Sequence, residues 1–282
     1  LNRRVDFETL SKEFTVRGIA HMPVKGYYLR KLYPVSELRT FGDIDMLIRR
    51  EDRQKVHELM LSLGYSVKQN WEPTYSYIKG AEYYEIHTNL MDGNLDNRAD
   101  LKAYFDAAWR YAEPDDGLRY RPASDFHFIY TVCHLAKHLY GGGAGLRMYL
   151  DIALYIKNES ARLNMENIER EMAALQLTGF FHTLMNACSA WFGTECGCSL
   201  PPPDEAAIKK LLCYTLDSDL FGHSRDHAVI ELRNSESKKP AKGKLIRNML
   251  FPPAGQIESR YTFLPVSYTH LRAHETVLDI VC

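Results

Sequence analysis

The spacing of apolar residues predicts short strands in the first part of the chain. Segments rich in aromatic and β-branched residues are typical of strands, and they cover residues 16–24, 43–48, 65–69, 74–80 and 82–90. In the segment 43–48, apolar residues alternate with a second face that carries two aspartates. This segment therefore predicts a strand with one apolar and one acidic face.

Two segments between these strands have helical character. Residues 25–33 end before Pro34, which does not continue a helix. Residues 50–65 carry an apolar stripe at helical spacing, and Gly64 ends it. The stripe consists of Val56, Leu59, Met60 and Leu63. The order of strands and helices predicts a small mixed β-sheet with helices on one face.

The apolar period changes to 3.6 residues after Pro122, which predicts helices. These helices cover residues 123–140, 146–158, 164–177, 180–192 and 204–216. The glycine run at 141–145 lacks the Lys-Ser/Thr ending of a phosphate loop, so a turn is expected there. We predict an α+β protein with a small mixed-sheet domain over residues 1–122 and an α-helical bundle domain over residues 123–262.

Composition and charge narrow the class of protein. Of the 282 residues, 45% are hydrophobic and 25% are charged, as in ordinary globular proteins. The net charge of −1 and the lack of an aromatic–basic stripe argue against a nucleic-acid partner. No run of apolar residues is long enough for a membrane span. The six cysteines form no CxxC pair, so free thiols in a reducing cytoplasm are expected.

The two ends of the sequence carry separate expectations. The chain opens at Leu1 rather than at a methionine, and we expect it to be a fragment. Residues 263–282 resemble a tail that recurs at the ends of unrelated gene predictions, and we expect this tail to be non-native. His270 and His274 are therefore not proposed as ligands.

Candidate chemistry begins at Asp43 and Asp45. Residues i and i+2 of a strand point to the same face, so both carboxylates share one small volume. Like charges held close together repel each other unless a cation lies between them. Mg²⁺ or Mn²⁺ is the expected cation because both prefer oxygen ligands. Gly42 would let a ligand approach the backbone, and the alternative is a strand end whose two acids face water.

Glu85 extends this hypothesis. It lies in the last predicted strand, and it completes a three-carboxylate cluster if that strand lies beside residues 43–48. Three carboxylates can hold two metal ions about 3.5–4 Å apart, a geometry that serves phosphoryl or nucleotidyl transfer. The alternative is a solvent-facing glutamate on an edge strand.

An ordered set of short motifs spans residues 18–157. The set comprises Lys25-Gly26, Tyr33-Pro34, Arg39, Asp43/Asp45, Glu85/His87, His134/Lys137/His138 and Leu146-Arg147/Asp151. With these motifs the chain resembles the polymerase-beta-type nucleotidyltransferase superfamily. It resembles more closely a bacterial family described as uncharacterised nucleotidyltransferases.

The resemblance implies a function and roles for individual residues. It implies transfer of a nucleoside monophosphate from an NTP, with ATP expected, to a hydroxyl of a small molecule or protein, with Mg²⁺ or Mn²⁺ as cofactor. Asp43 and Asp45 would bind the metals that bridge the triphosphate, and Glu85 the metal next to the acceptor hydroxyl. Phosphate would be bound by Lys25, Gly26, Arg39 and Gly42, and the substrate cleft lined by His87, His134, Lys137 and His138.

Two other functions remain open from the residues. The superfamily usually has Gly-Ser where Gly26 is followed by Tyr27, so a non-catalytic nucleotide- or partner-binding module is one alternative. The other is a metal-dependent hydrolase that uses His134, His138 and Asp151, because two histidines at i and i+4 can ligate one ion. The default interpretation of Asp151 is an ion pair with Arg147, one helical turn away.

Overall fold

The computed structural model describes residues 2–39, 43–91, 100–141, 144–197 and 199–216. These residues fall within one compact unit, Leu1–Ser224. The expected tail at 263–282, Gly42 and two glycines of the run at 141–145 lie outside the described residues. The division of the chain at residue 122 into two domains stays a prediction.

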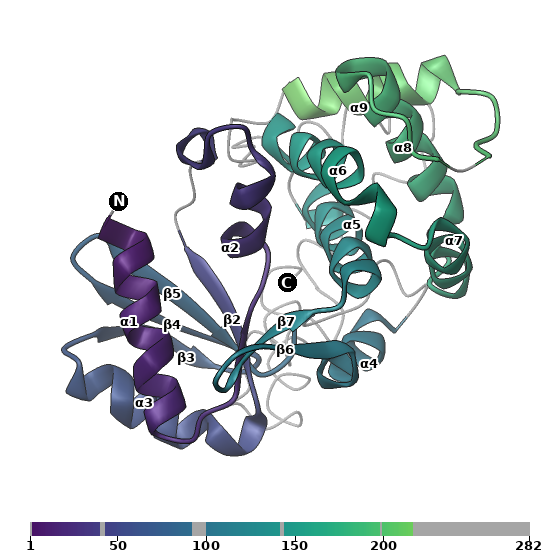
Figure 1. Ribbon diagram of the computed structural model, residues 1–282. Coiled ribbons are helices and arrows are strands. Elements are labelled where there is room, and N and C mark those ends of the chain that lie inside the picture. The colour runs from purple at the N-terminus through teal and green to yellow at the C-terminus, as the bar shows by residue number, and fades with distance from the viewer. Residues whose placement is uncertain (1, 40–42, 92–99, 142–143, 198, 217–282) are drawn as a thin grey trace, which may run out of the picture. The chain divides into compact units, whose positions relative to one another are not determined.

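A mixed β-sheet forms the first half of the described chain (Figure 1). The sheet has seven strands in the order β3-β4-β5-β2-β1-β7-β6. The pairs β2–β5 and β1–β7 are parallel, and the other neighbours are antiparallel. The strands are β1 His21–Pro23, β2 Ile44–Ile48, β3 Ser66–Trp71, β4 Thr74–Lys79, β5 Glu82–His87, β6 Ala112–Asp116 and β7 Arg119–Pro122. The α+β class with a mixed sheet is therefore confirmed.

Helices α1 (Asn2–Val16) and α3 (Arg53–Ser62) pack on one face of the sheet. Their apolar side chains share a core with the residues of β2 that the alternation placed on its apolar face. This core includes Phe7, Leu10, Phe14, Ile44, Met46, Ile48, Val56, Leu59 and Met60. The stripe predicted for α3 is buried at these last three positions, and the helix ends before Gly64, whose φ is 83°.

The opposite face of the sheet packs against the second half of the chain. Leu47, from the acidic face of β2, lies in a large core with side chains of the helices that follow β7. These helices are α5 Ser124–Gly141, α6 Leu146–Glu159, α7 Met165–Ala174, α8 Thr178–Phe192 and α9 Glu205–Leu216. All five residues of β2 are buried. The prediction of helices on one face alone was wrong, because β2 is covered on both sides.

The predicted elements and the observed ones differ where the sequence has little apolar periodicity. The segment 25–33 forms only a short α2, Gly26–Leu29, and a 3-10 turn at Arg30–Leu32. The interpretation missed α1, α4 (Leu101–Asp106) and the β6–β7 hairpin. The β6 segment reads Ala-Glu-Pro-Asp-Asp and its last three residues are exposed, so its pattern is that of a loop.

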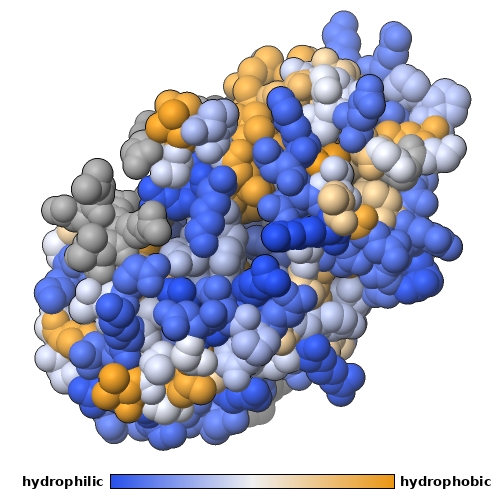
Figure 2. Space-filling model, viewed as in Figure 1, coloured by the Kyte–Doolittle hydropathy of each residue, from blue (hydrophilic) through white to orange (hydrophobic). Residues whose placement is uncertain are grey.

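No helix within the described residues is long and apolar enough to cross a membrane. On the face shown in Figure 2, hydrophilic residues cover most of the sheet half, and a band of hydrophobic residues reaches the surface near the helices.

Gly117 generates a prediction about stability. It turns the chain between β6 and β7 with φ of 59°, and a Cβ at this position would lie 2.9 Å from Thr15 Cγ2 of α1. Gly80 has the same backbone, φ 58°, but a Cβ there would meet nothing within 4 Å. We expect G117A to lower the free energy of unfolding by about 1 kcal/mol more than G80A, because only G117A adds a steric clash.

Urea unfolding of both variants measures this difference. Thr15→Ala removes the clashing side chain. In a Thr15→Ala background, G117A should therefore cost about as much as G80A does in the wild type, because only the backbone strain remains. Equal losses in G117A and G80A would show that the backbone conformation alone decides the effect.

Candidate active site

The central strands bring the predicted carboxylates together. β2 and β5 are parallel neighbours, and their register places Asp45 directly beside Glu85. The predicted pairing of these two strands is therefore confirmed. Asp43 precedes Asp45 by two residues and is half-buried, as is Glu85. Because residues of paired strands share a face, these carboxylates lie on the face of the sheet that meets the helical half.

Asp45 is the most enclosed member of the group, with 5% of its surface exposed. Its Oδ1 atom accepts a hydrogen bond from Lys25 Nζ at 2.7 Å and another from His87 Nε2 at 2.8 Å. His87 Nδ1 lies 3.1 Å from Thr74 Oγ1 on β4, which fixes the imidazole ring. Glu85 Oε2 lies 3.9 Å from His87 Nε2. Two donors therefore share one oxygen of a buried carboxylate.

Burial and neighbouring charges shift the pKa values of the three carboxylates in different directions. Burial and the charge of Asp45 raise the pKa values of Asp43 and Glu85 above their ordinary values. Burial also acts to raise the pKa of Asp45, but the charge of Lys25 and the hydrogen bond from His87 outweigh it and hold that pKa well below its ordinary value. Asp45 is therefore the carboxylate of the group that stays ionised.

Lys25 is held in place from its backbone as well as from its side chain. Its φ of 47° is left-handed, a conformation that costs a non-glycine residue about 1–3 kcal/mol. The Lys25 N–H donates to His127 Nε2 of α5 at 3.1 Å, and the Lys25 carbonyl accepts from the N–H groups of Tyr28 and Leu29 at the start of α2. These contacts aim the ammonium group at Asp45. Gly26, the next residue, is buried as the first residue of α2.

Helix α5 contributes the side of the site opposite the strands. Lys25 Nζ lies 5.7 Å from the ring centroid of Tyr130, which is fully buried. The ring of His134 lies 5.9 Å from that of Tyr130, and the Nε2 atoms of His134 and His138 are 3.2 Å apart. Burial, followed by the charge of Lys25, lowers the pKa of His134 well below its ordinary value. The row from Tyr130 to His138 thus leads away from the carboxylates along α5, and Lys137 is half-buried beside it.

Arg39 joins the segment before β2 to helix α6. Its Nε and Nη2 atoms donate to the two carboxylate oxygens of Asp151 at 2.7 and 2.8 Å. Tyr33 Oη donates to the same carboxylate at 2.8 Å. Asp151 is therefore paired with Arg39, and its expected ion pair with Arg147 stays a prediction. The Nη1 atom of Arg39 is buried and has no hydrogen-bond partner among the described residues.

The donor atoms at the strands fit a divalent cation. Ligand atoms of Asp45, Glu85 and His87 lie within 4.8 Å of one another, and in the described part of the chain this is the only such group of three. Carboxylate oxygens suit Mg²⁺ or Mn²⁺, whereas the His87 Nε2–H is used in the bond to Asp45. Asp43 lies outside the group. The alternative site at His134, His138 and Asp151 does not form a group within the described residues, and Asp151 is bound to Arg39.

Three contacts of this site were not predicted from the sequence. The resemblance assigned Lys25 to phosphate and His87 to the substrate cleft, yet Lys25 and His87 bind Asp45, and His127 binds Lys25. The His127 contact spans 102 positions of the sequence. Local spacing carries no signal for such a contact.

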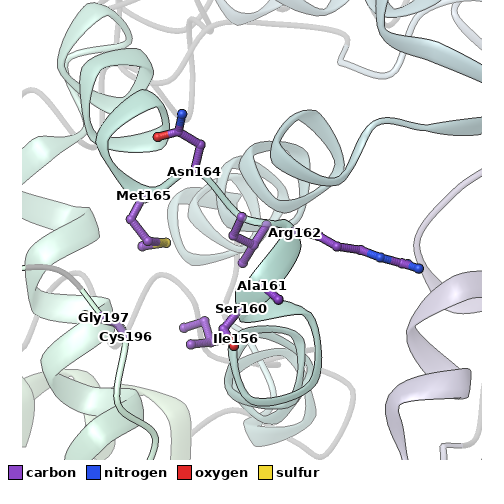
Figure 3. A pocket seen from close by; sticks show the side chains of 9 residues that line it. Ile156, Ser160, Ala161, Arg162, Asn164, Met165, Cys196 and Gly197 are labelled. Atoms are coloured by element: carbon purple, nitrogen blue, oxygen red, sulfur yellow. The ribbon is translucent and has the colours of Figure 1, made fainter.

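Two cavities of the described chain lie away from this cluster. One of about 540 Å³ lies between α6, the turn at Ser160–Arg162, the start of α7 and the segment at Cys196 (Figure 3). Another of about 670 Å³ is lined by residues of β6, β7, α5 and α7. No predicted site residue lines either cavity.

The comparison with protein families decides the assignment. The model of a family described as uncharacterised nucleotidyltransferase matches residues 3–193, more than half of the chain. The chain belongs to this nucleotidyltransferase family. Its members are named for nucleotidyl transfer, and the chain is an enzyme of this class. A comparison with curated proteins finds no match.

Solved structures of other nucleotidyltransferases are similar to this family member at low identity. The solution structure of the antibiotic-resistance factor ANT(2″)-Ia is 14% identical, with a TM-score of 0.44, over 65% of this chain and 93% of that one. The crystal structure of ANT(2″)-Ia in complex with adenylyl-2″-tobramycin is 13% identical, with a TM-score of 0.46, over 62% and 98%. The lincomycin-bound lincosamide antibiotic adenylyltransferase LnuA is 17% identical, with a TM-score of 0.37, over 53% and 93%.

The Arg39–Asp151 pair predicts a large effect on stability. Asp151→Asn keeps the shape of the side chain but leaves the buried guanidinium of Arg39 without a counter-charge. We expect the free energy of unfolding to fall by about 3–5 kcal/mol. Glu159→Gln on the same helix removes a more exposed pair with Arg162 and should cost less than about 1 kcal/mol. Similar losses in both variants, measured by urea unfolding, would contradict this account.

His127 predicts a pH dependence. Burial, and then the charge of Arg39, lowers its pKa from 6.5 to about 3, so the folded protein keeps the ring neutral. Below pH 6.5 the unfolded chain binds a proton at this residue that the folded chain does not, so stability falls with pH down to about 3. The slope from this group approaches about 1.4 kcal/mol per pH unit.

His127→Gln keeps an acceptor for the Lys25 N–H but does not titrate. Urea unfolding at about pH 7 and about pH 5 should therefore show a smaller acid loss in H127Q than in the wild type. Equal acid losses would mean that the imidazole is protonated in the folded state.

Proposed function

We propose that the protein transfers a nucleoside monophosphate from an NTP to a hydroxyl group of a small molecule, with the help of a divalent cation. The observation that carries this proposal is the register that sets Asp45 beside Glu85 on adjacent parallel strands, with Asp43 two residues away. Family membership supports the reaction type. The enclosure of Asp45 supports an acceptor slender enough to reach a recessed site.

Asp45, Glu85 and Asp43 are the residues that would hold Mg²⁺ or Mn²⁺. Their oxygen atoms suit a hard cation, and the close ligand atoms of Asp45 and Glu85 support this choice. When bound, the cation supplies positive charge that offsets the charge of the phosphates. His87 would orient Asp45 through the Nε2–H bond and would be fixed in turn by Thr74.

The reaction is an in-line substitution at the α-phosphorus of the NTP. The acceptor oxygen forms a bond to this phosphorus while the bond to the oxygen that bridges to the β-phosphate breaks, and pyrophosphate leaves. Glu85 would take the proton of the acceptor hydroxyl, because its raised pKa makes it a stronger base than an ordinary carboxylate. ATP is the expected donor, and a cytoplasmic location suits a need for NTP and Mg²⁺.

The remaining predicted residues fit binding roles. Gly26 would allow close approach of a phosphate to the backbone at the start of α2. Arg39 would direct its unpaired Nη1 group to a phosphate oxygen, since Asp151 already fixes the rest of the guanidinium. His134, Lys137 and His138 would line the acceptor side on α5.

One observation favours a second candidate function, a nucleotide-binding module without turnover. Asp45 Oδ1 already accepts two hydrogen bonds within the protein, so the carboxylate has internal partners at the position where a metal ligand is needed. In this alternative the Lys25–Asp45 pair would replace the catalytic cation, and nucleotide would bind without release of pyrophosphate.

Pyrophosphate release tests the proposal. Each NTP is incubated with the protein, Mg²⁺ or Mn²⁺ and a pool of small hydroxyl compounds. We expect release with one nucleotide and a more than about 100-fold loss in Asp45→Asn, which exceeds the usual effect of residues that only support a metal ligand. Asp52→Asn is the matched control, because Asp52 is also buried but pairs with Lys55 at the start of α3.

The outcomes separate the two candidates. Release that disappears in Asp45→Asn and persists in Asp52→Asn supports the transferase. NTP binding in calorimetry without release for any acceptor supports the binding module. Neither binding nor release would contradict both.

A further inference from the structure

The ammonium group of Lys25 contacts the buried carboxylate of Asp45. Its Nζ atom is 2.7 Å from Asp45 Oδ1, and only 15% of the side chain is exposed. The family resemblance implied that this lysine binds phosphate. Its partner in the structure is the carboxylate of Asp45, which lies beside Glu85. A positive charge of the protein itself is therefore present where the proposed function requires cations.

This contact limits the number of metal ions that Asp45 can serve. In a site with two ions about 3.5–4 Å apart, a carboxylate that binds both ions needs an oxygen atom for each of them. Asp45 is the one suited to this role, because it has Glu85 beside it in the next strand and Asp43 two residues before it. Its Oδ1 atom, however, accepts from both Lys25 and His87. Asp45 therefore has its Oδ2 atom left for one cation.

Lys25 is not free to move away from this position. Its left-handed backbone is fixed by the N–H bond to His127 and by the two N–H groups of α2 that bind its carbonyl. Its side chain lies beside the fully buried ring of Tyr130. Backbone strain that is maintained by several surrounding contacts is typical of residues whose placement serves a function.

The sum of charges agrees with a single ion. Asp43, Asp45 and Glu85 carry three negative charges when ionised, and Lys25 cancels one of them. Arg39 adds nothing to this sum, because Asp151 neutralises it. One divalent cation therefore neutralises the two negative charges that remain.

We propose that Lys25 takes the place of one of the two metal ions of a two-metal nucleotidyl transfer site, so that the protein uses a single divalent cation. This inference rests on the proposed function and adds a role for Lys25. The ammonium group orients Asp45 and supplies fixed positive charge, while the other cation site is formed by Asp45 Oδ2 and Glu85, with Asp43 beside them. Lys25 is in this sense a positioning residue that also contributes charge.

Counting bound Mn²⁺ by electron paramagnetic resonance tests the inference without any turnover. The protein is titrated with Mn²⁺ in the presence of an NTP analogue that has a methylene group between the α- and β-phosphates and no acceptor. We expect one bound Mn²⁺ per chain in the wild type and two in Lys25→Met, which has a side chain of similar length without charge. Lys31→Met is the matched control, because Lys31 belongs to the same segment but lies over the rings of Tyr27 and Tyr28.

Each other count contradicts the inference. Two Mn²⁺ in the wild type would overturn it and leave the proposed function intact. One Mn²⁺ in both the wild type and Lys25→Met would show that Lys25 does not exclude the second ion. No Mn²⁺ in any variant would contradict the proposed function itself. If Lys25→Met does not fold, as judged by circular dichroism, the wild-type count decides between one ion and two.

Discussion

The buried carboxylate of Asp45 is the constraint on which the arrangement of the site depends. A charge with this little exposure is costly unless opposite charge and hydrogen bonds compensate for it. Lys25 and His87 provide both at the same oxygen atom. Losing one partner of such a buried pair typically costs about 3–5 kcal/mol, so Lys25 and the strand that carries His87 are fixed relative to β2.

This compensation extends into the helical half of the chain. Lys25 reaches Asp45 because its backbone takes a strained conformation, and His127 of α5 accepts the N–H that this conformation exposes. His127 can accept only while it is neutral, and it donates its other ring N–H to Tyr155 at 3.3 Å. A second buried pair, Arg39 with Asp151, links the segment before β2 to α6. The two halves therefore meet at charged groups that belong to the site.

The sequence predicted the periodic part of this fold and the acidic part of the site. Strand β2 and helices α3 and α5 to α9 were predicted from apolar periodicity, and strands β3 to β5 from their aromatic and β-branched residues. The rule that i and i+2 share a face placed Asp43 with Asp45. Elements without that periodicity, such as the β6–β7 hairpin, were missed because tertiary contacts rather than pattern stabilise them. The Lys25–Asp45 and Lys25–His127 contacts were missed for the same reason, since they join residues from separate elements.

The contacts of Lys25 and Tyr27 give a reason why this chain lacks the usual Gly-Ser motif at Gly26 and Tyr27. A serine hydroxyl at this turn could offer a neutral hydrogen bond to a phosphate, whereas the residue before Gly26 is a lysine whose charge is directed into the carboxylates. A serine in place of Tyr27 would also remove a ring that packs on Phe7 at 4.3 Å and an Oη group that donates to Glu8 of α1. The turn thus contributes to the core on one side and to the charge of the site on the other. The first role belongs to Tyr27, which stands in place of the serine, and the second to Lys25, which precedes the motif.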